Sequence, residues 1–578
     1  MSGGGRTRKK GDAECEIPEG WQPLIVAFTC NWCSYAGADF AGISRMQYPA
    51  TIRVVRLMCS GRMNPSFILG ALEMGADGVF VSGCHPGDCH YTFGNRSGQE
   101  AVETAIEMAE MVGLCGERIH LQWVSASEGA LFARSVEEFT KQITELGPNP
   151  LQREPLEQAV VDMVCSPLED MTVPAVPGDA PETTDEGMGI LRQAFDSTRA
   201  YRCIECGKCT GICPVTARLP AFHPRRLVIK GLYGLDGELA YDHTIWACLE
   251  CGLCREACRV DVDLPEFIRR MRTLARSEGR VETGTHHGLV HTFDRLCSHD
   301  FLSPDLTAWT KGARLRFRSD SDAVFVSGYA GSLEQIIPDV EYDTGASPRD
   351  AVRILNSLGV RPQLFKAERP SGHDLYYTGD NEAFFRLACM NSEALRATGA
   401  KRAIFVCPET MHTYRDLYPK VTGEPLGVEC VHVIELVTEA IAEERVALRM
   451  LPGDMGDGAI AYHDSCRMGR MLDLYVEPRI AIEETGDHMV ELEHNRGYAD
   501  CCGVGAWQRC DPTSRALRLA RLKETLDAGA DRLVTPCSRC TVHFKCQQCH
   551  DGVDPDPDTN DIEIIDLATY VADRIVKL

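Results

Sequence analysis

Two cysteine-rich stretches decide how the middle of this chain folds: CIECGKCTGICP at 203–214 and CLECGLCREACR at 248–259. Each has the spacing CxxCxxCxxxC. Three thiolates spaced by two residues can hold three corners of a [4Fe-4S] cubane, and the fourth lies far enough along the chain to reach a neighbouring cluster. The pattern therefore predicts two cubanes that exchange their fourth ligands. One set would be Cys203, Cys206, Cys209 and Cys258, and the other Cys248, Cys251, Cys254 and Cys213.

Zinc is the alternative metal for these thiols. A structural zinc ion needs only four sulfurs, and eight thiols in this order exceed that requirement. Pro214 follows the first run, as in bacterial ferredoxins, whereas Arg259 takes that place in the second. Amphipathic stretches such as LPEFIRRMRTLA (264–275) flank the cysteines, and strand patterns are scarce. We therefore expect a small helical domain at 187–300.

The composition narrows the classes of function. The chain has 578 residues and 28 cysteines, and 84 acidic against 60 basic residues give a formal charge of −24. Nucleic acid and anionic membranes favour basic surfaces, and no apolar run is long enough to cross a bilayer, so neither partner is expected. Residues 1–19 do not have the pattern of a signal peptide. We therefore expect them to form a disordered tail on a cytoplasmic protein. In that reducing compartment, CxxC cysteines more often bind metal than form disulfides.

Before the cubane motifs, short apolar runs alternate with helical patterns. The runs LIVAF (24–28), IRVVRL (52–57), DGVFVS (77–82) and IHLQW (119–123) predict the parallel strands of an α/β domain at 20–150. A proline-rich, acidic linker follows at 151–186. Ligands gather beyond the carboxyl ends of parallel strands. We therefore expect five thiols to meet at that edge: Cys30, Cys33, Cys59, Cys84 and Cys89.

The stretches CNWCSYAGAD, MCSGR and GADGVFVSGCHPGDCHY resemble the MvhD/FlpD family. Members of that family relay electrons from a hydrogenase or a formate dehydrogenase to the flavoprotein of heterodisulfide reductase. The resemblance implies one [2Fe-2S] cluster on four of the five thiols, and the sequence leaves open which four. A zinc or purely structural thiol cluster is the alternative. We interpret His85 and His90 as loop residues rather than ligands.

After residue 322, strand patterns return and one of them occurs twice. GAKRAIFVCPETMHTY (399–414) aligns with GADRLVTPCSRCTVHF (529–544), and both place a cysteine eight residues after the glycine. Strand-like runs also occur at 323–328, 459–465 and 562–567. Two α/β copies, at 322–450 and 451–578, explain the repeat. The predicted fold class is therefore multidomain α/β: a parallel N-terminal domain, a helical ferredoxin-like domain and two C-terminal modules.

The second copy carries HDSCRMG, CCG and CSRC, and with these motifs it resembles the CCG-domain family, which includes the B subunit of heterodisulfide reductase. The dicluster block before it resembles the C subunit of the same enzyme. The resemblance implies a noncubane [4Fe-4S] cluster that handles thiol and disulfide sulfur. Its ligands, and the expected site of any catalysis, would be Cys466, Cys501, Cys502, Cys537 and Cys540.

The first copy departs from the family pattern. Tyr329 stands where the opening cysteine belongs, Pro370-Ser371-Gly372 replaces Cys-Cys-Gly, and Thr410 follows Cys407 in place of the last cysteine. A protein that splits a heterodisulfide with two noncubane clusters needs both copies intact. One-cluster relatives, such as DsrK-type or lactate and glycolate oxidase-type iron–sulfur subunits, are therefore the nearer analogy. We expect the first copy to be a packing partner.

Two further interpretations compete for the C-terminal thiols. Cys537, Cys540, Cys546 and Cys549 have a spacing that a zinc ion could close tetrahedrally, although the Cys-Cys-Gly would then lack a purpose. CQQCH (546–550) matches the attachment signature of c-type haem, which a protein without an export signal is not expected to carry.

Together these patterns predict an iron–sulfur oxidoreductase subunit that transfers electrons within a heterodisulfide reductase-like complex. No GxGxxG follows a strand, so FAD is expected only in a partner. One expected partner is a flavoprotein resembling the A subunit of heterodisulfide reductase, and the other is a hydrogenase, formate dehydrogenase or other donor. A thiol or disulfide reductase, a pure electron relay and a zinc-stabilised scaffold remain as alternatives.

Overall fold

The computed structural model describes residues 17, 20–151, 185–451 apart from 330–332, 335, 338, 339 and 341, then 458–549 and 559–578. Nearly all of the predicted tail (1–19) and linker (151–186) falls outside these residues. The chain forms two compact units, Met1–Val176 with His286–Pro304, and Pro177–Thr285 with Asp305–Leu578. Among the described residues, no helix has the length and apolar character that a membrane span requires.

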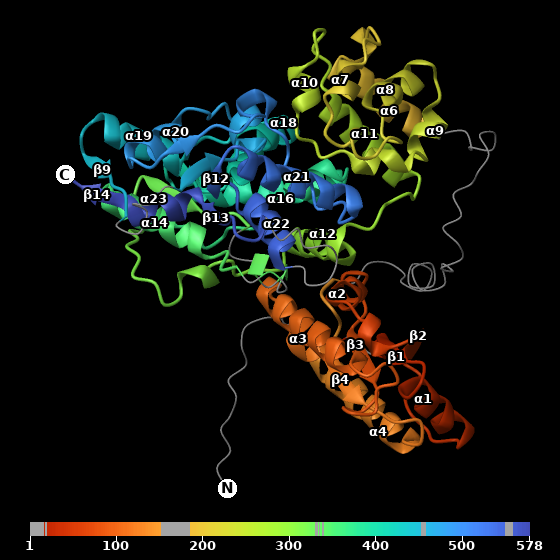
Figure 1. The fold of residues 1–578 in the computed structure, drawn as a ribbon. Coiled ribbons are helices and arrows are strands. Elements are labelled where there is room, and N and C mark those ends of the chain that lie inside the picture. Colours follow the sequence, from red (N-terminus) through yellow and green to blue (C-terminus); the bar gives the residue numbers. More distant parts are fainter. Residues whose placement is uncertain are drawn as a thin grey trace. The chain divides into compact units, whose positions relative to one another are not determined.

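The first unit contains a parallel sheet with the strand order β2-β1-β3-β4 (Figure 1). Its strands are β1 Ile25–Cys30, β2 Ile52–Leu57, β3 Gly78–Gly83 and β4 Ile119–Trp123, which match the four apolar runs of the sequence. Its core joins strand residues such as Ile25 and Phe80 to Phe132 and Phe139 of a helix. The helices are α1 Ser34–Ile43, α2 Pro65–Glu73, α3 Gly94–Val112 and α4 Gly129–Leu146.

A segment distant in sequence completes this unit. Helix α12 (Thr285–Cys297) follows the dicluster motifs in the chain, but residues 286–304 cluster with the N-terminal sheet. The Arg295 guanidinium donates hydrogen bonds of 2.6 and 2.9 Å to the two carboxylate oxygens of Glu73. The His287 ring lies 5.8 Å from the Phe67 ring, measured between centroids. The expected helical domain extended to residue 300, and its last helix instead packs here, because helical periodicity does not show which core a helix joins.

The second unit begins with the helical dicluster domain that the sequence predicts. Helix α11 (Leu264–Ser277) runs through its core, where Phe267, Met271 and Leu274 are fully buried. The Asp263 carboxylate accepts a 3.2 Å hydrogen bond from the Glu266 backbone N–H and so caps this helix. The helices are α6 Asp185–Thr198, α7 Lys208–Gly211, α8 Pro224–Leu232, α9 Asp236–Ala240, α10 Leu253–Glu256 and α11 Leu264–Ser277.

Two α/β modules complete the second unit, and they have the same sheet topology. The first has the order β6-β5-β7-β8 and the second β11-β10-β12-β13, with all strands parallel. This agreement confirms the predicted repeat and the multidomain α/β fold class. The strands are β5 Ala323–Val326, β6 Gln363–Leu364, β7 Arg402–Phe405, β8 Glu429–His432, β10 Ala459–Tyr462, β11 Met489–Val490, β12 Ala530–Thr535 and β13 Glu563–Asp566.

The two modules are joined by an antiparallel pair of strands, β9 Val446–Leu448 and β14 Ile575–Lys577. The helices of the first module are α14 Ala346–Ser357, α15 His373–Tyr377, α16 Asn381–Ala397, α17 Pro408–His412, α18 Tyr418–Thr422 and α19 Val433–Ala442. Those of the second are α20 Glu477–Glu484, α21 Pro512–Asp527, α22 Ser538–Cys549 and α23 Leu567–Arg574.

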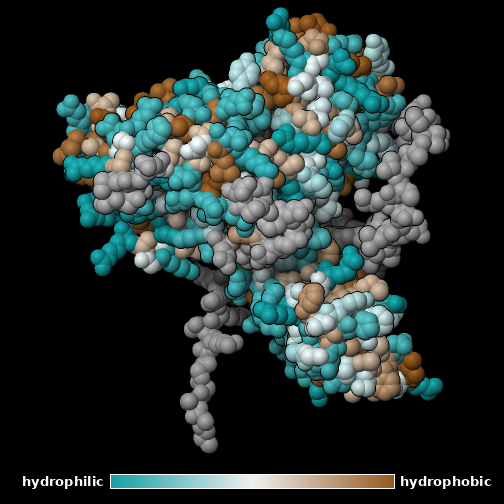
Figure 2. Space-filling model, in the orientation of Figure 1, coloured by the Kyte–Doolittle hydropathy of each residue, from teal (hydrophilic) through white to brown (hydrophobic). Residues whose placement is uncertain are grey.

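Hydrogen bonds from buried residues of α11 connect the dicluster domain to the first module. Arg272 of α11 is fully buried, pairs with Glu250 and donates a 2.9 Å hydrogen bond to the Tyr377 carbonyl. On the same helix, Glu266 accepts a 2.8 Å hydrogen bond from the Tyr376 hydroxyl. Most of the surface in Figure 2 is hydrophilic, and brown apolar patches interrupt it over the dicluster domain, at upper right.

Candidate metal centres

The five N-terminal cysteines meet at one edge of the first sheet. The sulfurs of Cys30 and Cys84, at the ends of β1 and β3, lie 3.8 Å apart. Cys84 is also in hydrogen-bond contact with Cys33, and Cys59 with Cys89. Burial raises the pKa of the Cys84 thiol well above its usual range. Several thiolates can share such a site only with a compensating positive charge, so this donor set fits a metal.

A glycine makes room for this thiol cluster. A Cβ atom added at Gly94, the first residue of α3, would overlap the Cys59 sulfur and lie 3.3 Å from the Cys89 sulfur. The two neighbouring histidines have other contacts. His85 Nε2 lies 2.6 Å from the Glu128 carboxylate, and the His90 ring stacks on Trp32 with centroids 3.9 Å apart.

One of the predicted cubane sets lines a single cavity. The walls of this cavity include Pro214, Phe222 and Leu253. Burial raises the pKa of the Cys213 thiol to about 11, so thiolates in this apolar space need a metal to stabilise them. The four thiols come from both CxxCxxCxxxC runs, as ligand exchange between the runs requires: Cys213, Cys248, Cys251 and Cys254.

The other predicted cubane set lies close to the surface. Cys203 and Cys206 lie close enough to Cys209 to raise the pKa of its thiol, and Cys206 is exposed. The Cys258 sulfur accepts a 3.3 Å hydrogen bond from the Val262 backbone N–H. Four basic side chains around this loop have no ion-pair partner within the described part of the chain: Arg202, Lys208, Arg225 and Arg226. Basic side chains therefore gather near the exposed cysteine of a strongly acidic chain, although the exposed Glu205 directly precedes it.

All five thiols expected in the second module are brought into one continuous series of contacts. Cys501 touches Cys466 and Cys502, Cys502 touches Cys540, and Cys540 touches Cys537. Cys501, Cys502, Cys537 and Cys540 are no more than 3% exposed. The adjacent pair Cys501-Cys502 stands between the other thiols, so five soft donors converge on one site. This donor set suits iron or another thiophilic metal.

Two further thiols extend this series, and no sequence motif pointed to their contacts. Cys251, expected to ligate a cubane, is in hydrogen-bond contact with Cys501, which lowers the pKa of the Cys251 thiol to about 6. At the other end, Cys407 of the first module contacts Cys537. Spacing within a motif could not reveal either contact, because both depend on how separate domains pack.

The equivalent site of the first module is filled by side chains. Tyr329, Ser371 and Thr410, which replace three of the five cysteines, are each at most 2% exposed. A Cβ added at Gly328 would lie 2.6 Å from the Thr410 hydroxyl oxygen and 3.2 Å from the Cys407 Cβ. The replacements therefore occupy the space that ligands would need.

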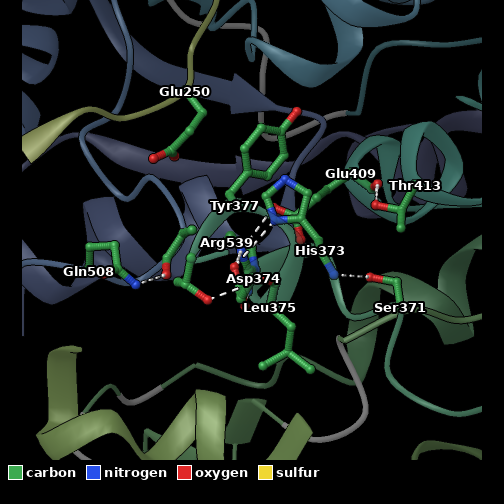
Figure 3. Close-up of polar contacts among 12 residues, drawn as sticks. Glu250, Ser371, His373, Asp374, Leu375, Tyr377, Glu409, Thr413, Gln508 and Arg539 are labelled. Carbon is green, nitrogen blue, oxygen red and sulfur yellow. Dashed lines mark hydrogen bonds and ion pairs between the residues drawn. The ribbon is translucent and has the colours of Figure 1, made fainter. Parts of the chain in front are cut away.

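A buried network of charges lies beside these replacements (Figure 3). Arg539, from the CSRC motif, pairs with Asp374 and donates a 2.9 Å hydrogen bond to Glu409, and its guanidinium lies 4.7 Å from the Tyr329 ring centroid. Arg467, next to Cys466, donates a 3.0 Å hydrogen bond to His373 Nε2. Burial and the nearby arginines lower the pKa of His373 far below its usual value, so its imidazole is neutral.

The zinc alternative at the C-terminus fits the structure poorly. Cys540 and Cys546 lie on the same helix, α22, six residues or about 9 Å apart along its axis. Tetrahedral zinc sulfurs bond at about 2.3 Å from the ion and cannot be so far apart. Arg518 instead donates a 3.5 Å hydrogen bond to the Cys546 sulfur. His550 of the CQQCH haem signature lies outside the described residues.

Known proteins match three separate parts of the chain. Residues 25–147 match the family described as methyl-viologen-reducing hydrogenase, delta subunit. The D-type iron-sulfur subunit of the vhc F420-non-reducing hydrogenase from Methanococcus voltae is 52% identical over 136 residues, which make up 24% of this chain and 94% of that protein. The chain belongs to the delta-subunit family through its N-terminal domain. This confirms the resemblance to MvhD/FlpD.

The other two matches lie in the second unit. Residues 199–262 match the 4Fe-4S dicluster domain, and residues 460–545, all within the second module, match the cysteine-rich CCG domain. Besides its delta-subunit domain, this chain thus contains two further iron–sulfur domains, as predicted. It is an iron–sulfur electron-transfer protein related to hydrogenase delta subunits and heterodisulfide reductase.

The delta-subunit domain also occurs in larger relatives. The A subunit of the ferredoxin/F(420)H(2)-dependent CoB-CoM heterodisulfide reductase from Methanosarcina acetivorans is 49% identical over 126 residues, which are 22% of this chain and 16% of that protein. Among solved structures, a hypothetical protein from Helicobacter pylori aligns at 12% identity over 67% of this chain and 72% of that chain. Its TM-score of 0.37 is too low to carry an argument.

Proposed function

We propose that this chain is an electron relay of a heterodisulfide reductase-like complex and carries four iron–sulfur clusters. Four of the five N-terminal thiols would hold a [2Fe-2S] cluster, and the two CxxCxxCxxxC runs would hold two [4Fe-4S] cubanes with exchanged fourth ligands. The noncubane cluster would be held by Cys466, Cys501, Cys502, Cys537 and Cys540. When bound, such clusters accept and release single electrons at potentials that their surroundings tune.

The contact between Cys251 and Cys501 supports this proposal, because Cys251, which we propose as a cubane ligand, touches the C-terminal thiol set. Two arginines that follow Cys466 in the chain connect its loop to the loop of Cys251. Arg467 donates a 2.8 Å hydrogen bond to the Glu250 carbonyl, and Arg470 donates a 2.6 Å hydrogen bond to the Cys251 carbonyl. These hydrogen bonds connect the two thiol sets through backbone carbonyls of the dicluster loop.

Burial favours a relay over a reductase that acts at this site. Four of the five C-terminal thiols are almost inaccessible, so a substrate disulfide could reach them only after the surrounding side chains moved. Thiol or disulfide reduction remains the second candidate function, because adjacent cysteines such as Cys501-Cys502 suit sulfur chemistry in the related CCG domains. Turnover of a disulfide by the isolated full-length chain would favour that candidate.

The exposed Cys206 and its basic surroundings support a partner at the first cubane. We expect this partner to be a flavoprotein resembling the A subunit of heterodisulfide reductase, since a relative with that name shares the N-terminal domain. The N-terminal domain would meet a second protein, a hydrogenase, a formate dehydrogenase or another donor, since its relatives are named as hydrogenase subunits.

Magnetic coupling between clusters tests the proposed route. In anaerobically prepared, reduced full-length protein, the electron paramagnetic resonance (EPR) signals of a cubane and of the C-terminal cluster should broaden or split each other, since their thiols touch. Cys206→Ser, which alters the other cubane at the surface, should leave this coupling in place. Uncoupled signals would remove the observation on which the proposal rests, and stoichiometric zinc in place of iron would identify a scaffold instead.

A further inference from the structure

His463 is a buried residue at the C-terminal thiol site to which none of the cysteine motifs assigns a role. It directly follows β10 in the stretch HDSC, three residues before Cys466, and is 1% exposed. Its ring packs edge to face against Phe544, with centroids 5.1 Å apart. One ring nitrogen and the sulfurs of Cys502 and Cys540 lie within 4.8 Å of one another. The imidazole therefore borders the thiol site directly.

The two nitrogens of this imidazole have different surroundings. Nδ1 lies 3.1 Å from Nε of Arg521, which donates a hydrogen bond to it. Nε2 is buried and has no hydrogen-bond partner, sulfur included, within the described part of the chain. His463 is in contact with the Cys502 thiol, so its Nε2 is a buried nitrogen beside sulfur that still lacks a partner. Arg521 is itself anchored, since it donates hydrogen bonds of 2.8 Å to the His494 carbonyl and 2.6 Å to Glu524.

The arginine decides which nitrogen carries the proton. An arginine Nε–H can only donate, so the Nδ1 that receives it must present its lone pair. A hydrogen on Nδ1 would collide with the Arg521 hydrogen, which excludes both the other neutral tautomer and the doubly protonated ring. The proton of His463 is therefore on Nε2, the nitrogen that faces the sulfurs. A nitrogen that carries a hydrogen cannot coordinate a metal.

We propose that His463 is a positioning residue that donates an Nε2–H hydrogen bond to sulfur of the C-terminal cluster, and that Arg521 enforces this role. The inference rests on the proposed function, because it assumes that the five cysteines of the second module hold a cluster. Hydrogen bonds to cluster sulfur stabilise the more negative, reduced state and so raise the reduction potential. His463 thus tunes the end point of the relay and is not a sixth ligand.

A redox titration of the anaerobically prepared full-length chain, followed by EPR, tests this role. His463→Phe keeps the ring volume and removes the donor, so the C-terminal cluster should become at least tenfold harder to reduce, equivalent to about 59 mV for one electron. His463→Gln still offers an N–H at similar reach and should recover most of the shift. Arg521→Gln should lower the potential, whereas Arg518→Gln, an equally buried arginine on α21 that contacts Gln547 instead, should not.

Hyperfine spectroscopy of ¹⁵N-histidine-labelled wild-type protein keeps the inference testable if a variant fails to assemble. A hydrogen-bond donor gives weak nitrogen coupling and an exchangeable deuterium signal. His463→Phe should remove both, and His463→Gln should remove only the nitrogen coupling of the labelled histidine. Strong coupling typical of a coordinated nitrogen, or an unchanged potential in His463→Phe, would overturn the inference. A wild-type chain without any C-terminal cluster signal would instead refute the proposed function, so the two failures are distinguishable.

Discussion

The two C-terminal modules have the same sheet topology, but different side chains line their interiors. Both have four parallel strands in the same order, and both keep a glycine at positive φ where Cys-Cys-Gly ends, Gly372 at 72° and Gly503 at 95°. Around Gly503 the site is lined by thiols, whereas around Gly372 it contains Ser371, Tyr329 and buried charges. The backbone of the motif thus persists without its ligands, because the turn needs the glycine whether or not the site holds a metal.

The ion network lies beside the position of the first module at which the second module has its thiols. Arg539 stands between Cys537 and Cys540 of the second module, and its guanidinium pairs with Asp374 and Glu409 of the first. A buried guanidinium of this kind balances carboxylates that would otherwise be unpaired. The first module therefore has a structural role, because its acidic side chains pair with the arginine of the CSRC motif in the second module.

The largest difference between the modules is expected from substitutions at equivalent positions. Cys502→Ser should abolish the EPR signal of the C-terminal cluster and spare the cubane signals, because the adjacent cysteine pair stands at the centre of the thiol contacts. Ser371→Ala, at the matching position of the first module, should leave every cluster signal unchanged. Similar spectra for the two variants would break the distinction between a ligated and a filled site.

Breaking the ion network should lower the stability of the fold without removing a cluster ligand. Arg539→Met removes the cation that pairs with the buried Asp374 and Glu409, which should lower the free energy of unfolding by about 3–5 kcal/mol. Arg402→Met is the matched control, since Arg402 forms an exposed pair with Glu429 in the first module and should leave the unfolding midpoint nearly unchanged. Chemical denaturation followed by circular dichroism measures both, and equal midpoints would show that the buried network contributes nothing.

The shared glycines should behave alike in stability and differently in spectroscopy. Gly372→Ala and Gly503→Ala each force a side chain into the left-handed region, so each should lose about 1–2 kcal/mol of unfolding free energy. Only at Gly503 would the added Cβ crowd His543, 3.3 Å away beside the thiols, so only that variant should change the C-terminal EPR signal. A changed signal in Gly372→Ala would mean that the first module also shapes the cluster.

The smallest effect is expected at Cys407, the one motif cysteine that the first module keeps. Its thiol contacts Cys537, but five other thiols already complete the expected ligand set. Cys407→Ser should therefore retain the C-terminal signal with a slight shift, read by EPR at matched protein concentration. Loss of the signal would make Cys407 a sixth ligand and assign part of the working site to the first module.

Much of the fold could be predicted from the sequence. The runs at 24–28 and 77–82 overlap β1 and β3, which are buried throughout, because continuous apolar segments between helical patterns mark buried parallel strands. The two-residue strands β6 and β11 carry too few residues for any periodicity. The place of α12 in the first unit depends on the Arg295–Glu73 pair, and no local pattern can predict such a distant contact.

The candidate sites could be predicted only as sets of thiols. Motif spacing identified the cysteines that converge, but the contact between Cys251 and Cys501 joins two domains and is created by packing alone. The same holds for His463, whose role depends on which nitrogen Arg521 faces. A histidine beside a cysteine motif carries no such information in the sequence.

The iron content of the wild-type chain tests most directly that one module of the two holds a cluster. Anaerobically prepared protein should contain about 14 iron atoms per chain, from one [2Fe-2S] cluster, two cubanes and one noncubane cluster. Mössbauer spectroscopy on the same sample should assign four of them to a single noncubane site. A content of about 18 would place a second cluster in the first module, and about 10 would leave both modules empty. Either result would contradict a division into one ligated and one filled module.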